Sequence, residues 1–104
     1  MNYSLKLVLA STTPVSIWVA SSVPKNKGRK VIREFQARTV SDGDITQFVI
    51  TETIRELRDN HNFIIEDVSE IRDSTGCYEC IEVVPFQVLR KIYPRLIARK
   101  KSLI

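Results

Sequence analysis

The chain has 104 residues, of which 43% are hydrophobic, 27% charged and 8% aromatic, and its formal net charge is +4. A chain of this length normally folds around one hydrophobic core, so we predict a single domain over residues 1–104. The balance of apolar and charged residues excludes a wholly disordered protein. Three glycines and four prolines exclude a collagen-like or low-complexity chain, and one histidine and two cysteines are too few for most zinc sites or a disulfide scaffold.

The first part of the chain is predicted to form β-strands. Residues 3–9 and 15–20 both alternate between apolar and polar side chains, which is the period of a half-buried strand. Ser-Thr-Thr-Pro at residues 11–14 is typical of a turn, so these two strands are expected to form an antiparallel hairpin. After a polar loop that contains Pro and Gly, residues 31–39 alternate again and predict a third strand.

Residues 41–44, Ser-Asp-Gly-Asp, have the composition of a helix N-terminus. The serine can accept a hydrogen bond from a first-turn N–H, and the aspartates favour the positive end of the helix dipole. We therefore predict a helix over residues 45–59, with Ile54 on its apolar face, that ends at Asn-His-Asn. His61 is expected to interact with the carbonyl groups at the helix C-terminus and not to act in catalysis.

The last third of the chain is predicted to form a hairpin and then a helix. Residues 63–71 and 78–84 flank a turn at residues 73–76. The first of these segments also fits helical spacing over residues 66–71, but its leading Phe-Ile-Ile favours a strand. Pro85 is expected to begin a final helix, which Pro94 would kink or split.

The resulting order β-β-β-α-β-β-α predicts an α+β domain with a five-stranded, mostly antiparallel sheet and a kinked C-terminal helix. This order resembles the OB-fold, in which a helix lies between the third and fourth of five strands and one face commonly binds oligonucleotides. The resemblance is topological only, and other small α+β folds share it. The expected core comprises Leu5, Leu7, Val15, Ile17, Phe35, Ile50, Ile54, Leu57, Ile65, Ile81 and Val83.

Charge is strongly segregated along the chain. Residues 1–41 carry seven basic side chains and one acidic one, residues 42–82 carry three basic and eleven acidic ones, and residues 83–104 carry six basic ones and no acid. The two basic segments are candidate phosphate-binding regions. Their candidate nucleic-acid-binding residues are Lys25, Lys27, Arg29, Lys30, Arg33, Arg90, Lys91, Arg95, Arg99, Lys100 and Lys101.

Two interpretations of this charge pattern remain open. In the first, a small non-catalytic binding protein contacts RNA or DNA through the two basic segments, and Trp18, Tyr78 or Tyr93 stacks on bases. No recognised reader motif accompanies these residues. In the second, the chain is a protein-interaction or regulatory module, a homodimer or a partner-binding protein, without a nucleic-acid ligand. Apolar residues near the C-terminus would then pack on the partner: Leu96, Ile97, Leu103 and Ile104.

No catalytic residue, metal site or cofactor is predicted, so the chain is not expected to be an enzyme. Cys77 and Cys80 form a Cys-x-x-Cys motif, but a reactive pair needs a helix N-terminus, and Cys80 lies in a predicted strand. A zinc site would need two further ligands. No nucleophile elbow or phosphate-binding glycine loop occurs. A Mg²⁺ site would require several carboxylates to converge, but the available acids are explained as solvent-facing strand residues. These acids are Glu66, Asp67, Glu70, Glu79 and Glu82.

The longest apolar stretch, residues 5–20, is interrupted by the polar turn at residues 11–14. A membrane-spanning helix needs about 20 mostly apolar residues, and the apolar core of a secretory signal is usually unbroken. We therefore expect a cytoplasmic protein without membrane contact, whose two cysteines are free thiols.

Overall fold

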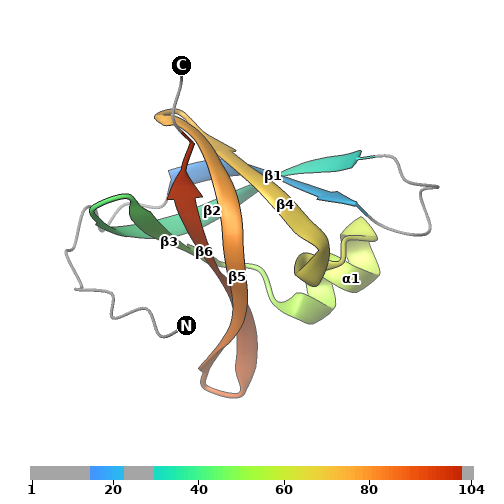
Figure 1. Cartoon of the computed structure of the whole chain (residues 1–104). Coiled ribbons are helices and arrows are strands. Elements are labelled where there is room, and N and C mark those ends of the chain that lie inside the picture. The colour runs from blue at the N-terminus through green and yellow to red at the C-terminus, as the bar shows by residue number, and fades with distance from the viewer. Residues whose placement is uncertain (1–14, 23–29, 102–104) are drawn as a thin grey trace.

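A computed structural model describes residues 15–22 and 30–101 of the chain. Six antiparallel strands close into a β-barrel in the order β1-β2-β3-β6-β5-β4, and one short helix follows the third strand (Figure 1). The barrel closes where β1 pairs with β4, with Val19 opposite Ile71. The elements are β1 Val15–Ser22, β2 Lys30–Asp42, β3 Ile45–Ile50, α1 Ile54–His61, the 3-10 turn η2 Ile65–Asp67, β4 Val68–Asp73, β5 Gly76–Val88 and β6 Lys91–Lys100.

Short turns fix the register of the barrel. Between β2 and β3, Gly43 has a φ of +61°, a conformation that glycine adopts without a steric penalty. Between β4 and β5, the Asp73 carboxylate accepts hydrogen bonds from the backbone N–H groups of Thr75 at 2.8 Å and Gly76 at 3.1 Å. Such Asx turns satisfy backbone donors that the sheet leaves unpaired.

The core lies inside the barrel and is built from alternate residues of the strands. Phe35 contacts Phe63 edge to face with ring centroids 5.6 Å apart, and Phe48 contacts Tyr78 in the same way at 5.2 Å. Leu57 of α1 is fully buried in the same core. Of the predicted core residues, Ile17, Phe35, Ile50, Leu57 and Ile65 are buried, whereas Val15, Ile54, Ile81 and Val83 are half-buried and Leu5 and Leu7 lie outside the described residues.

The helix α1 begins at a capping box. The Thr53 side chain accepts a hydrogen bond from the Glu56 backbone N–H at 3.1 Å, and the Glu56 carboxylate accepts one from the Thr53 N–H at 3.4 Å. These two bonds satisfy donors that the first turn of a helix leaves free. The helix ends at Asn62, which has a φ of +55°.

Three of the predicted strands are confirmed, because residues 15–20, 31–39 and 78–84 lie in β1, β2 and β5. The predicted strand at residues 3–9 lies outside the described residues. The segment 63–71 is only partly a strand: it contains η2 and then enters β4. The five-stranded sheet and the OB-like order are wrong, because the described barrel has six strands.

The helix predicted over residues 45–59 is wrong in its first half. Residues 45–50 form β3, which pairs with β2 on one side and β6 on the other. Its alternating residues and β-branched side chains fit a strand that contributes every second side chain to the barrel interior. Only residues 54–59 of the predicted helix are helical, within α1.

The kinked C-terminal helix is also wrong. Residues 85–88 continue β5, and after a two-residue turn the chain returns as β6. Pro94 does not disrupt β6, because β6 pairs with β3 only from Arg95 onward and Pro94 has β5 as its partner strand. Proline is tolerated in a strand where its missing N–H faces an unpaired edge.

Candidate binding site

Exposed large apolar side chains of the described residues occur in two places. Trp18 and Ile32 lie on the outer surface of β1 and β2, and four others lie in the hairpin of β5 and β6. Contiguous exposed apolar surface commonly marks a site of interaction. Hollows adjoin both places, and the hollow at the first one is lined by an exposed tryptophan, so it is the primary candidate site.

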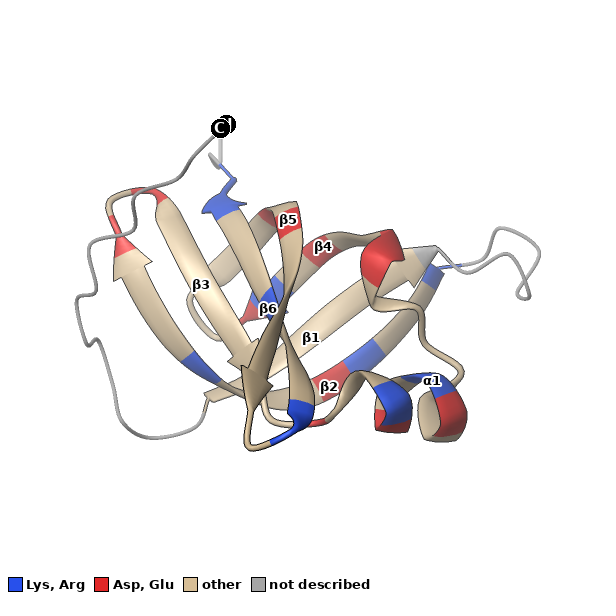
Figure 2. Ribbon diagram, turned by 90° about the horizontal axis from the view of Figure 1, so that it is seen from below, with Lys and Arg blue, Asp and Glu red and all other residues tan. Residues whose placement is uncertain are grey.

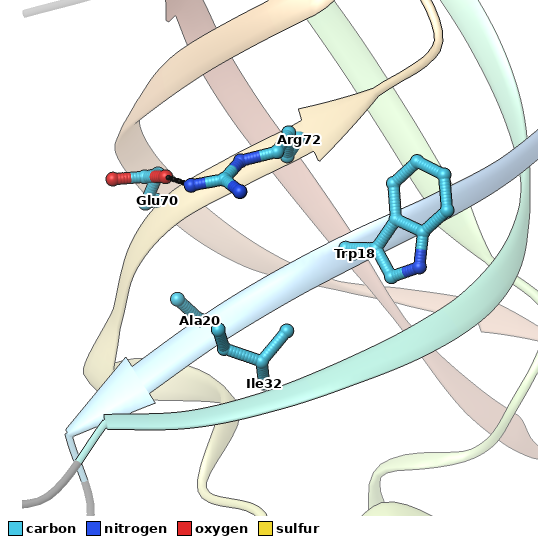
Figure 3. A pocket seen from close by; sticks show the side chains of 5 residues that line it. All are labelled: Trp18, Ala20, Ile32, Glu70 and Arg72. Carbon is cyan, nitrogen blue, oxygen red and sulfur yellow. Dashed lines mark hydrogen bonds and ion pairs between the residues drawn. The ribbon is translucent and has the colours of Figure 1, made fainter.

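The hollow on β1 is a pocket of about 330 Å³, lined by Trp18, Ala20, Ile32, Glu70 and Arg72 (Figure 3). The strand register explains why these side chains share one face: Trp18 lies opposite Arg72 of β4, and Ala20 lies opposite both Ile32 and Glu70. The small Ala20 side chain forms the floor between larger neighbours. Trp18, 39% exposed, and Ile32, 56% exposed, form apolar walls. We call this site the Trp18 pocket.

Two charged side chains, Glu70 and Arg72, form the remaining wall of the Trp18 pocket. The Arg72 guanidinium donates a hydrogen bond to Glu70 Oε1 at 2.8 Å, and Lys101 Nζ lies 3.4 Å from Glu70 Oε2. The hydrogen bond from Arg72 lowers the pKa of Glu70, although partial burial opposes this shift. Glu70 is therefore ionised at neutral pH and holds two cations beside the apolar surface.

Each of the two basic segments, residues 1–41 and 83–104, has a lysine within the described residues that lies near the Trp18 pocket. Lys101 binds Glu70, and Lys30 lies on β2 two residues before Ile32, so it shares the outer face with Ile32. Arg33 is exposed on β2 and lies on the alternate face of that strand. Lys25, Lys27 and Arg29 lie outside the described residues.

The other predicted cations do not form one surface. Arg90 lies in the turn between β5 and β6, and the remaining ones are distributed along β6: Lys91, Arg95, Arg99 and Lys100. With about 3.3 Å per strand residue, roughly 30 Å separate Lys91 from Lys100. Figure 2 shows basic residues at both ends of β6. Arg95 is half-buried, and its Nε has no hydrogen-bond partner within the described part of the chain.

Only one of the three aromatic residues predicted to stack on bases is well placed to do so. Tyr78 is 6% exposed in the core, and its hydroxyl lies 2.6 Å from the Thr75 hydroxyl, so its ring is not available for stacking. Tyr93 is half-buried on β6 opposite Phe86. Trp18 is the exposed ring.

Two of the four apolar residues predicted to bind a partner, Leu96 and Ile97, are not presented at the surface. Leu96 is fully buried inside the barrel, and Ile97 is 5% exposed. Leu103 and Ile104 lie outside the described residues. Leu96 and Ile97 were predicted to lie on a helix, but they lie on β6, where both side chains are buried.

The structure places His61 beside a carboxylate and both cysteines in β5. His61 is the last residue of α1, and its Nε2 lies 2.8 Å from the carboxylate of Glu52, which precedes the helix. Cys77 and Cys80 are free thiols in β5, and burial raises the pKa of Cys80 to about 11. Within residues 15–22 and 30–101, no three His, Cys, Asp or Glu side chains are grouped so that they could hold a metal ion.

The raised pKa of Cys80 predicts low reactivity. Because the thiolate is the nucleophile, a shift from 9.0 to about 11 leaves roughly 100-fold less thiolate at pH 8. In a Cys77→Ser variant, iodoacetamide should therefore modify Cys80 at least about 10-fold more slowly in the folded protein than in denaturant, because the greater nucleophilicity of a thiolate with a higher pKa offsets part of the loss. Equal rates in the two states would show that Cys80 is not held in an apolar environment.

No protein-family model matches the chain, and no curated protein or solved structure is significantly similar to it. The part of the chain that the structure describes contains no helix with the length and apolar character needed to span a membrane.

Proposed function

We propose that this protein is a non-catalytic binding protein for single-stranded RNA or DNA, and that the Trp18 pocket holds an unpaired base. One observation carries this: an exposed tryptophan and Arg72 line the same hollow, and Lys101 Nζ lies 3.4 Å from the carboxylate of Glu70, which also lines it. Proteins that bind single strands combine aromatic rings, on which bases stack, with cations along the path of the phosphates.

The chemistry of the pocket favours an unpaired base over a paired one. Stacking on Trp18 requires a free base face, which a base inside a duplex does not offer. The apolar walls formed by Trp18 and Ile32 accept a planar ring, and Glu70 and Arg72 place a hydrogen-bond acceptor beside a donor at the rim. Base edges carry both kinds of group.

The cations around the pocket predict a moderate dependence on salt. If Lys30, Arg72 and Lys101 contact three phosphates, the slope of log K against log salt should be near −2, because each phosphate contributes about −0.7 on a single strand. The Kd of a labelled oligonucleotide of about 12 nucleotides, measured by fluorescence anisotropy, should then rise about 20-fold between about 50 and about 200 mM salt.

Two lysine variants and a control test whether this pocket is the site. Lys30→Ala and Lys101→Ala should each weaken binding and reduce the salt slope by about 0.7. Lys91→Ala removes the same charge at the far end of β6 and should change neither quantity. Absence of binding at low salt, or an equal loss in all three variants, would contradict the proposal.

A further inference from the structure

The second group of exposed apolar residues belongs to an arm that extends beyond the barrel. β3 pairs with β6 only from Arg95 onward, and β4 pairs with β5 only up to Glu79. Residues 84–88 and 91–95 therefore pair chiefly with each other, and Figure 1 shows this hairpin projecting from the barrel. We call residues 84–95 the arm. Its exposed large apolar side chains are Phe86, Val88, Leu89 and Ile92.

The tip of the arm is unfavourable for the isolated chain. Leu89 and Arg90 have φ values of +46° and +70° in a two-residue hairpin turn, a geometry that strongly prefers Asn and Gly. Leu89 is also 93% exposed. Neither the backbone strain nor the exposed leucine stabilises the barrel. Both are consistent with an apolar side chain presented to a partner.

A groove of about 710 Å³ lies between the arm and α1. Ile54 and Ile92 provide apolar surface there, and Arg58, Arg90 and Lys91 provide positive charge. Arg55 and Asp59 also line the groove, and Arg55 Nε lies 3.6 Å from the Asp59 carboxylate in an exposed pair. Asp59 is the one acid among the described residues that line the groove. The groove is therefore electropositive, with aliphatic side chains between its cations.

These contacts favour a polypeptide partner over a nucleic acid in the groove. Carboxylates of the partner would meet Arg58, Arg90 and Lys91, and its aliphatic side chains would cover Ile54 and Ile92. A nucleic acid would satisfy the cations but leave the aliphatic side chains without an apolar partner. Bases stack on aromatic rings, and an aromatic ring lines the Trp18 pocket, whereas the described residues that line this groove include none.

A second copy of the chain and an added β-strand both fit less well. Among the described residues, exposed large apolar side chains occur only in the arm and the Trp18 pocket, and two arms placed together would bring like charges together. The paired prolines Pro85 and Pro94 lack the N–H groups that an added strand would need. A partner would therefore bind through contacts with the side chains that line the groove.

We propose that the groove between α1 and the arm binds an acidic, amphipathic segment of a partner protein, independently of the Trp18 pocket. Such a segment, helical with apolar residues at i, i+3, i+4 and i+7, lays its apolar face into a groove while its acids pair with the rim. The partner is thus defined by its chemistry: aliphatic and acidic side chains on one helix.

The test uses a labelled synthetic peptide of about 14 residues with Leu on one helix face and Glu on the other, together with a peptide in which Lys replaces Glu. Fluorescence anisotropy with the full-length protein at low salt should detect binding of the Glu peptide only. The double variant Arg58→Glu/Arg90→Glu should raise the Kd at least 10-fold, and Ile92→Ser several-fold. Lys100→Glu, an equal charge reversal at the other end of β6, should leave the Kd within twofold of the unaltered protein.

Three outcomes would overturn this inference. The first is no binding of the Glu peptide at about 1 mM, or equal binding by the double variant and the Lys100→Glu control. The second is displacement of the peptide by an oligonucleotide, which would assign the groove to nucleic acid. The third is a dimer in light scattering that the double variant abolishes, which would make a second copy the occupant. Trp18→Ala should leave peptide binding unchanged, so failure of the Trp18 pocket is distinguishable from failure of the groove.

Discussion

Replacing Phe48 with alanine is expected to lower the free energy of unfolding by about 3–5 kcal/mol. Phe48 is fully buried, lies opposite Thr39 of β2 and Leu96 of β6, and contacts Tyr78 edge to face. Its removal leaves a cavity where three strands meet. Because domains of this size are stable by only about 5–15 kcal/mol, the variant should be close to unfolding at room temperature.

Urea unfolding followed by circular dichroism measures this effect, and Phe86→Ala is the matched control. This substitution removes the same side chain from the arm, where Phe86 is 38% exposed. Its loss should cost no more than about 1 kcal/mol, as is usual for substitutions outside the core. If Phe86→Ala destabilised the protein as much as Phe48→Ala, the core would not lie where the barrel places it.

Replacing Trp18 with alanine is expected to weaken oligonucleotide binding by about 5- to 150-fold, because stacking of one base on an aromatic side chain contributes about 1–3 kcal/mol. Trp18→Phe keeps an aromatic face and should retain most of the affinity. Ala20→Leu should reduce affinity as well, because the added side chain fills the floor of the pocket. Unchanged affinity in Trp18→Ala and Ala20→Leu would contradict a base in the Trp18 pocket.

The fold was predictable from the sequence where local alternation was uninterrupted, as in β1, β2 and β5. It was not predictable where two local signals competed. Asp42-Gly43 is a strong hairpin signal, but Asp42 and Asp44 also favour a helix N-terminus. Because the helix was preferred, β3 was not predicted. Thr53-Ile-Arg-Glu56 has the spacing of a capping box and marks the true start of α1.

The prediction of a kinked C-terminal helix was wrong for a different reason. Pro85 and Pro94 are typical of a helix start and a kink when each residue is considered alone. In the barrel they are cross-strand partners, and Pro94 precedes the part of β6 that pairs with β3. Whether β6 can contain a proline at this position depends on which strands lie beside it. Short-range spacing does not contain this information.

The candidate site was only partly accessible from the sequence. Trp18 and the cations Lys30 and Lys101 were predicted from residue type and charge segregation. Glu70 and Arg72 were not, because their position beside Trp18 depends on the pairing of β1 with β4, which joins segments about 50 residues apart. In the groove, Arg90 and Lys91 were predicted to contact nucleic acid and not a protein partner, and Arg58 was not predicted because it lies in the acidic middle of the chain.

The most direct test of the proposed function is the intrinsic fluorescence of Trp18, which is the one tryptophan of the chain. During titration with a single-stranded oligonucleotide, its emission should be quenched to saturation with the same Kd that anisotropy gives, and a duplex of the same sequence should quench it weakly. An oligonucleotide that binds by anisotropy and leaves Trp18 emission unchanged would contradict base stacking in the Trp18 pocket.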